Sequence, residues 1–88
     1  MEISFDLNLE PSYAEVLHQQ HGALDGQRFI TDLEDKIGGT FHQLLQRHQL
    51  LPAVGDRVQI DNELTVVVTI RSFEIEGGIW FSVRPYEA

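Results

Sequence analysis

The chain has 88 residues, 42% hydrophobic and 23% charged, so it can form one small globular domain (residues 1–88) but not two. Fourteen Asp and Glu residues against six Lys and Arg give a formal net charge of −8, which repels phosphate backbones, and we expect no nucleic-acid partner. The lack of cysteine excludes disulfides and thiolate catalysis. Without a long apolar run or a signal-like N-terminus, we expect a cytoplasmic protein that does not insert into membranes.

The N-terminal segment alternates between polar and apolar residues, which predicts a half-buried strand over residues 1–9. Its apolar positions, which we expect on one face, are Ile3, Phe5, Leu7 and Leu9. Ser12 and Glu15 then form a capping-box pattern, and Gly22 suits the end of a helix. We therefore predict a short helix over residues 13–21.

The middle segment, residues 23–38, is ambiguous. A second capping-box pattern begins at Thr31, and apolar residues at helical spacing continue to Ile37, ahead of Gly38-Gly39. A short helix over residues 31–37 competes with a strand through Arg28–Thr31 followed by one helical turn, and we favour the helix.

A third capping-box pattern at Thr40 opens the clearest helix of the chain. Phe41, Leu44, Leu45 and His48 follow at helical spacing, and Pro52 prevents continuation. We predict an amphipathic helix over residues 41–50, with its Phe and Leu side chains against a sheet.

After Pro52 the apolar period changes to two, which predicts a strand around Val58 and Ile60 and another over residues 64–70. Because the phase slips before Phe73 and Ile75, we expect a bulge near Arg71-Ser72. Gly77-Gly78 predicts a hairpin into a last strand from Ile79 to Arg84.

The register of this hairpin depends on its turn. A two-residue turn sets Ile75 opposite Trp80, whereas a three-residue turn sets Ile75 opposite Phe81 and Phe73 opposite Val83. We favour the second, because it buries the apolar face.

These elements together predict an α+β fold. We expect a small antiparallel sheet of about four strands, with a C-terminal three-stranded meander and two or three short helices on one face.

Residues suited to chemistry do not form a convincing catalytic or metal site. Glu15, His18 and His21 share a helical face as metal ligands can, but a second ligand pair at credible spacing is missing, and solvated histidines explain the pattern better. The serines lie outside any nucleophile motif, and the glycine pairs match no phosphate-binding loop. We expect neither enzymatic activity nor a cofactor.

A possible interaction surface lies on the last strand. If Ile79, Phe81 and Val83 face inward, Trp80 and Arg84 face outward, with Tyr86 close by. An exposed tryptophan beside an arginine is typical of binding hot spots. Alternatively, Trp80 covers the second face of the sheet together with Val67.

The segment from Pro52 to Val58 reads Pro-x-x-Gly-Asp-x-Val and lies between a helix and an apolar strand. With the preceding strand and the Tyr-Ala-x-Val sequence at Tyr13, it resembles the CorC/HlyC-type transporter-associated domain, closest to the C-terminal cytoplasmic domain of NhaP-type cation/proton antiporters. The resemblance implies that Pro52, Gly55, Asp56 and Val58 form a fold signature, in which Pro52 stops the helix and Gly55 and Asp56 shape the turn. It carries no catalytic residues.

Two functional hypotheses follow. The resemblance implies a non-enzymatic regulatory domain at the cytoplasmic face of the inner membrane, which modulates transport of K⁺ or Na⁺ through contacts with the transporter body, its basic cytoplasmic loops or a second copy. The alternative is a free-standing acidic binding module or inhibitor that mimics a polyanion.

Overall fold

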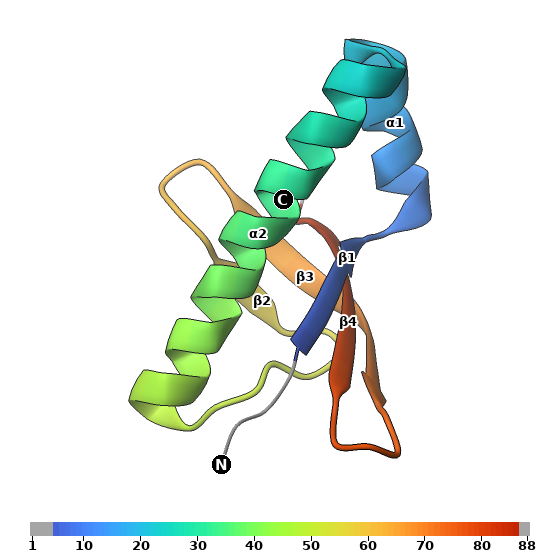
Figure 1. The fold of residues 1–88 in the computed structure, drawn as a ribbon. Helices are drawn as coiled ribbons and strands as arrows, with labels where there is room; N and C mark the ends of the chain where they lie inside the picture. Colours follow the sequence, from blue (N-terminus) through green and yellow to red (C-terminus); the bar gives the residue numbers. More distant parts are fainter. Residues whose placement is uncertain (1–4, 87–88) are drawn as a thin grey trace.

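The computed structural model describes residues 5–86. Two helices and a four-stranded sheet make up the fold, which confirms the α+β class (Figure 1). The elements in chain order are β1 (Phe5–Leu9), α1 (Pro11–His21), α2 (Ala23–His48), β2 (Arg57–Gln59), β3 (Thr65–Phe73) and β4 (Ile79–Pro85).

The strands lie in the order β1-β4-β3-β2. β2, β3 and β4 form consecutive antiparallel pairs, which confirms the C-terminal meander. β1 runs parallel to β4, so the sheet is mixed and the prediction of a purely antiparallel sheet was wrong. The two helices between β1 and the meander supply the long crossover that a parallel pair requires.

The alternation of the first strand is confirmed within the described residues. Leu9 is buried and Leu7 half-buried, whereas the alternating residues Asp6 and Asn8 are exposed. Ile3 lies outside the described residues, and the Phe5 side chain is likewise not described.

The two ambiguous helical segments are one helix of 26 residues, α2. The helical conformation predicted over 31–37 and from residue 41 is therefore confirmed, whereas the break between the two helices and the strand alternative were wrong. Apolar side chains at Ile30, Leu33, Ile37 and Phe41 continue through Gly38-Gly39 on one face, and all four lie in the core or against it. Burial of a Phe or Ile side chain contributes about 1.5–3 kcal/mol, which outweighs the roughly 1 kcal/mol that each glycine costs in a helix.

The helix ends also differ from the predicted capping boxes. α1 begins at Pro11, and the Ser12 hydroxyl donates to Glu10 Oε1 (2.9 Å) rather than capping the helix. Thr31 and Thr40 lie inside α2, where the Thr40 hydroxyl donates to the Lys36 carbonyl (3.2 Å). Proline suits the first turn because its missing N–H would have no partner there.

Gly22 ends α1 with a φ of +86°, as predicted. α2 ends at His48, before Pro52, because Gln49 adopts a left-handed conformation in which its N–H donates to the Leu45 carbonyl (2.9 Å).

The bulge and the hairpin register were predicted wrongly. The register shift lies between Val68 and Ile70. The favoured three-residue turn is confirmed, because the Glu74 N–H donates to the Gly78 carbonyl (2.7 Å) around residues 75–77, but β3 pairs Phe73 with Ile79 rather than with Val83. Phe73 and Ile75, both expected to face inward, are 64% and 103% exposed. The hairpin extends beyond the end of the sheet that α2 covers, so no helix buries these two side chains (Figure 1).

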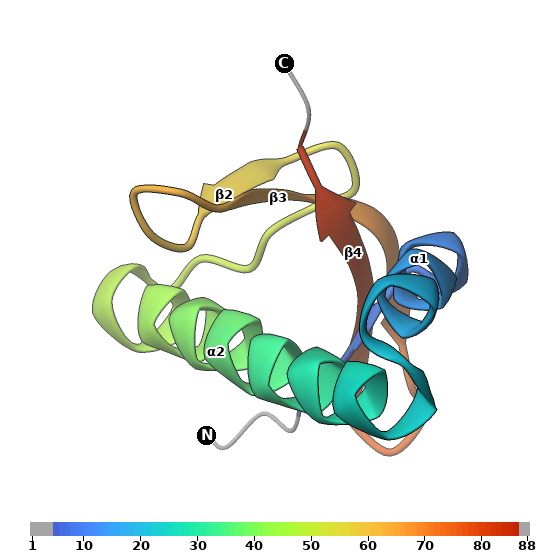
Figure 2. The same cartoon turned by 90° about the horizontal axis from the view of Figure 1, so that it is seen from above.

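α2 crosses one face of the sheet, which we call the inner face, and α1 lies beside the N-terminal part of α2 (Figures 1 and 2). Phe41 of α2 packs on Phe81 of β4 with the rings edge to face, 5.1 Å between centroids. The buried apolar residues form one cluster: Leu9, Leu17, Ile30, Ile37, Phe41, Val58, Val66, Val68, Ile79, Phe81 and Val83.

Candidate functional site

The segment from Pro52 to Val58 forms a tight turn into β2. The Asp56 N–H donates to the Ala53 carbonyl (2.9 Å), and the Ala53 N–H donates to Asp56 Oδ2 (2.8 Å). The backbone and the carboxylate of Asp56 therefore both bond to Ala53 and stabilise the turn. Gly55 has a φ of +92°, which a residue with a Cβ rarely adopts. Pro52 and Val58 are buried. In this structure the four signature residues therefore shape the chain path.

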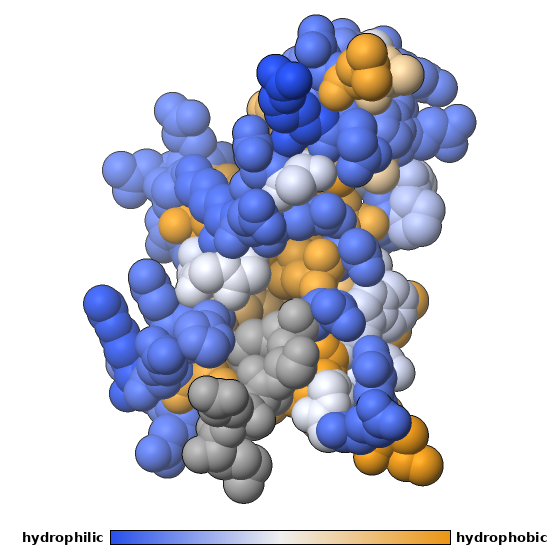
Figure 3. Space-filling view, viewed as in Figure 1, coloured by the Kyte–Doolittle hydropathy of each residue, from blue (hydrophilic) through white to orange (hydrophobic). Residues whose placement is uncertain are grey.

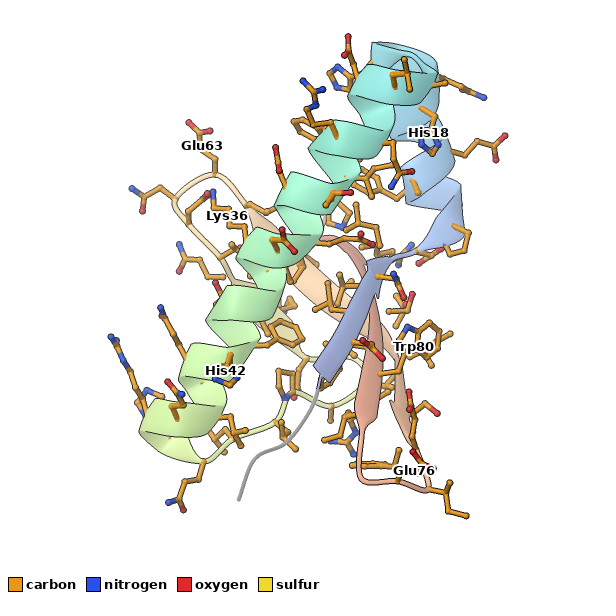
Figure 4. All side chains as sticks on the ribbon, viewed as in Figure 1. His18, Lys36, His42, Glu63, Glu76 and Trp80 are labelled. Carbon is orange, nitrogen blue, oxygen red and sulfur yellow. The ribbon has the colours of Figure 1, made fainter. Side chains whose placement is uncertain are left out.

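Trp80 lies on the sheet face opposite α2. We call this the outer face, and it carries Asp6, Asn8, Glu10, Arg57, Val67, Ile70, Trp80, Ser82 and Arg84. The indole N–H of Trp80 donates to Asn8 Oδ1 (2.7 Å), so the ring is held against β1. The side chain is half-buried, and it projects away from α2 (Figure 4).

Arg84 and Tyr86 extend the same face toward the C-terminal end of β4. Arg84 Nε lies 4.0 Å from Glu10 Oε2, and the guanidinium of Arg57 lies 4.8 Å from the centre of the Tyr86 ring. The structure thus brings Trp80, Arg84 and Tyr86, the predicted interaction residues, to one face, but each already has a contact within the chain.

Two open hollows follow this outer face. The first, of about 580 Å³, lies beside Trp80, Ile70 and Ser82, and the second, of about 560 Å³, beside Val16, Val67 and Tyr86. In the first hollow the Thr69 hydroxyl donates to the Ser82 carbonyl (3.0 Å) and the indole N–H is bonded to Asn8. Because these donors are satisfied, the walls favour apolar contact over polar recognition.

The histidines do not converge. His18 Nε2 lies 3.3 Å from Gln27 Oε1, and the His21 ring stacks on Phe29 with 5.0 Å between centroids. His18 and His42 lie toward opposite ends of the helical layer (Figure 4). Within residues 5–86, no group of three His, Asp or Glu side chains is placed to hold a metal ion.

The solvent side of α2 is polar (Figure 3). Asp25, Asp32 and Asp35 repeat at helical spacing opposite the buried residues, with Arg28 between them, and all four are exposed. We call the three aspartates the acidic stripe. None of them forms an ion pair with another described residue.

The adjacent β2–β3 loop is attached to α2 through an ion pair between Lys36 and Asp61. Asp61 Oδ1 also accepts the N–H groups of Glu63 and Leu64 (2.8 Å each). The hydrogen bond from Lys36 and those from the loop backbone lower the pKa of Asp61. Glu63 at the loop tip adds a further negative charge beside α2 (Figure 4).

Sequence reasoning missed Glu34, which protects the edge of the sheet. Its Oε2 accepts the Leu9 N–H (2.9 Å), a group that points away from β4, and it lies 3.4 Å from Asn8 Nδ2. An acidic residue on a helix carries no sequence signal for such a role. A covered edge resists pairing with another strand.

Comparison of the chain with protein-family models, curated proteins and solved structures finds no match. Of the helices within residues 5–86, none has the length and apolar character needed to span a membrane.

Proposed function

We propose that the chain is a non-enzymatic regulatory domain associated with a cation/proton antiporter for K⁺ or Na⁺, or with a related ion transporter, at the cytoplasmic face of the inner membrane. The resemblance around Pro52–Val58 supports this class of protein. The observation that carries the proposal is the acidic stripe, because its carboxylates are exposed and have no basic partner within the described chain.

The acidic stripe suits a basic partner surface. Cytoplasmic loops of membrane proteins are enriched in Lys and Arg, so loops of the transporter body have the complementary charge. The side chains lie on a long, well-anchored helix, which positions them at fixed spacing. Contacts of this kind between exposed charges speed association and weaken as salt rises.

A binding measurement tests the proposal. The peptides correspond to the basic cytoplasmic loops of the antiporter whose gene contains or adjoins this coding sequence. Each peptide carries a fluorescent label, and its binding to the chain is measured by fluorescence anisotropy. We expect binding at about 50 mM NaCl that weakens at least tenfold at about 500 mM. Absent binding, or binding that salt does not change, contradicts the proposal.

A matched pair of variants locates the contact. Asp32→Lys/Asp35→Lys reverses two charges of the acidic stripe, whereas Glu74→Lys/Glu76→Lys makes the same change in net charge on the β3–β4 hairpin. We expect the first to abolish peptide binding and the second to weaken it only slightly. Equal effects, together with equal binding to an unrelated polylysine, favour the alternative, a general polyanion mimic.

A further inference from the structure

No helix within residues 5–86 covers the centre of the outer face of the sheet. α2 covers the inner face, and α1 lies beside α2, so neither helix crosses the centre of β3 and β4 on the other side (Figures 1 and 2). α1 borders only one end of this face, where Val16 lines a hollow with Val67. Ile70 is 47% exposed although its neighbours along β3, Val66 and Val68, are buried. A sheet normally buries both faces or keeps one polar, and this face carries apolar side chains at its centre.

The outer face differs from the rest of the chain in its charge. Asp6 and Glu10 are balanced there by Arg57 and Arg84, so this face has no net charge. The excess of acidic over basic residues, which gives the chain its net charge of −8, therefore lies outside this face. Two copies of so acidic a protein repel each other at most orientations, but they can approach through a neutral face without that penalty.

Several polar groups at the centre of the outer face already have partners within the chain. The indole N–H of Trp80 is bonded to Asn8, the Thr69 hydroxyl to the Ser82 carbonyl, and Arg84 lies beside Glu10. An apolar surface placed over Trp80 and Thr69 therefore leaves their donors satisfied. The hollow of about 580 Å³ beside Ile70 and Trp80 also gives room for side chains that project from an opposing sheet.

Association through the edge of the sheet is less favourable than through its face. Glu34 accepts the outward N–H of Leu9 on the β1 edge, and an added strand would have to displace it. The β2 edge is only three residues long. Face-to-face packing of two sheets requires neither change.

We propose that two copies of this chain associate through their outer faces, with Ile70 and Trp80 of each copy packed against the other sheet. A twofold axis brings the same patch of both copies together, so each apolar group at the centre is buried in both copies. The acidic stripes then point away from the interface on both sides. This inference is independent of the proposed function.

Sedimentation equilibrium of the full chain, from about 5 to 500 µM, tests the association. We expect a monomer–dimer equilibrium that tightens as salt rises, because salt screens the repulsion between two acidic chains but hardly affects apolar contact. This salt dependence is opposite to that of the proposed peptide binding, so the two proposals fail separately. A monomer at every concentration and salt overturns the inference.

Substitutions locate the interface. Ile70→Glu places a charge at its centre and should raise the dimer dissociation constant by about tenfold or more. Ile75→Glu adds the same charge at the fully exposed hairpin tip and should have little effect. Because Ile70→Glu also changes a strand residue, circular dichroism checks its fold, and Ile70→Ala should weaken the dimer in the same direction.

The wild-type chain provides a second measurement. Trp80 is its only tryptophan, and we expect acrylamide to quench its fluorescence less at high protein concentration. A dimer that Ile70→Glu leaves intact, or quenching that does not depend on concentration, would show that the copies meet elsewhere and would overturn the inference.

Discussion

The indole nitrogen of Trp80 donates a hydrogen bond to the side-chain oxygen of Asn8, 72 positions earlier in the chain, at 2.7 Å. The bond joins β1 to β4 on the outer face and fixes the ring at the centre of the proposed interface. A typical hydrogen bond contributes about 0.5–1.5 kcal/mol net.

We expect Asn8→Ala to lower the free energy of unfolding by about 1 kcal/mol, because it leaves the indole N–H without its partner. Urea denaturation followed by tryptophan fluorescence measures this change, and the emission spectrum should shift as the ring loses its fixed position. Asn62→Ala, in an exposed loop, is the control and should change neither quantity. Equal stability of wild type and Asn8→Ala would show that the bond does not hold in solution.

Gly26 of α2 packs closely against α1. A Cβ added there would lie 2.9 Å from His18 Cα and 3.1 Å from the Leu17 carbonyl oxygen, both backbone atoms that a side-chain rotation cannot move away. Gly26→Ala should therefore destabilise the protein by about 1–3 kcal/mol.

Gly38→Ala is the matched control in the same helix, because nothing lies within 4 Å of its added Cβ. We expect it to stabilise the protein by about 0.5–1 kcal/mol through helix propensity. Thermal unfolding should thus show opposite shifts, each of about 4–8 °C per kcal/mol. Shifts of the same sign would contradict the tight helix contact.

Phe41 and Phe81 make the central aromatic contact between α2 and the sheet. Phe41 is 1% exposed and Phe73 64%, so the same substitution at each separates burial from residue type. We expect Phe41→Ala to cost about 3–5 kcal/mol of unfolding free energy and Phe73→Ala less than about 1. Chemical denaturation monitored by circular dichroism measures the unfolding free energy of both variants. A similar loss for the two would contradict the burial of Phe41 in the core.

Asp61 should make stability depend on pH in acid. Its pKa is lowered in the folded protein, chiefly by the hydrogen bond from Lys36, so its contribution is present above the unfolded pKa near 3.8. The contribution is lost as the pH falls through the lower, folded value. We therefore expect Asp61→Asn to unfold more easily at pH 7 and to lose less stability than wild type below about pH 4.

Asp25→Asn is the control for this measurement, because Asp25 forms no ion pair with another described residue. Urea denaturation at several pH values from neutral to acid should give nearly parallel curves for Asp25→Asn and wild type. If the curve of stability against pH for Asp61→Asn is also parallel to that of wild type, the Lys36–Asp61 pair does not contribute to stability in solution.

The strands could be predicted from their period, but the long helix could not. Leu7, Leu9 and Val58 lie inward as the alternation indicates. In α2, by contrast, Gly38-Gly39 and the threonines gave local stop and start signals, and the continuous burial of Ile37 and Phe41 against the sheet overrode them. Local signals are weak beside tertiary packing of this kind.

The hairpin register and the candidate site depended on contacts distant in sequence. A bulge at Val68–Ile70, rather than near Arg71-Ser72, changed which residues of β3 face inward. Trp80, Arg84 and Tyr86 were expected on one surface from the alternation of the last strand. Asn8 and Glu34 were missed, because their roles follow from the parallel pairing of β1 with β4, which no local pattern encodes.

The most direct test of the proposed regulatory role is cation-driven proton exchange in everted membrane vesicles that contain the associated antiporter and this chain. We predict that Asp32→Lys/Asp35→Lys shifts the cation concentration for half-maximal exchange by about fivefold or more, and that Glu74→Lys/Glu76→Lys leaves it at the wild-type value. Identical exchange curves for wild type and both variants would contradict the account.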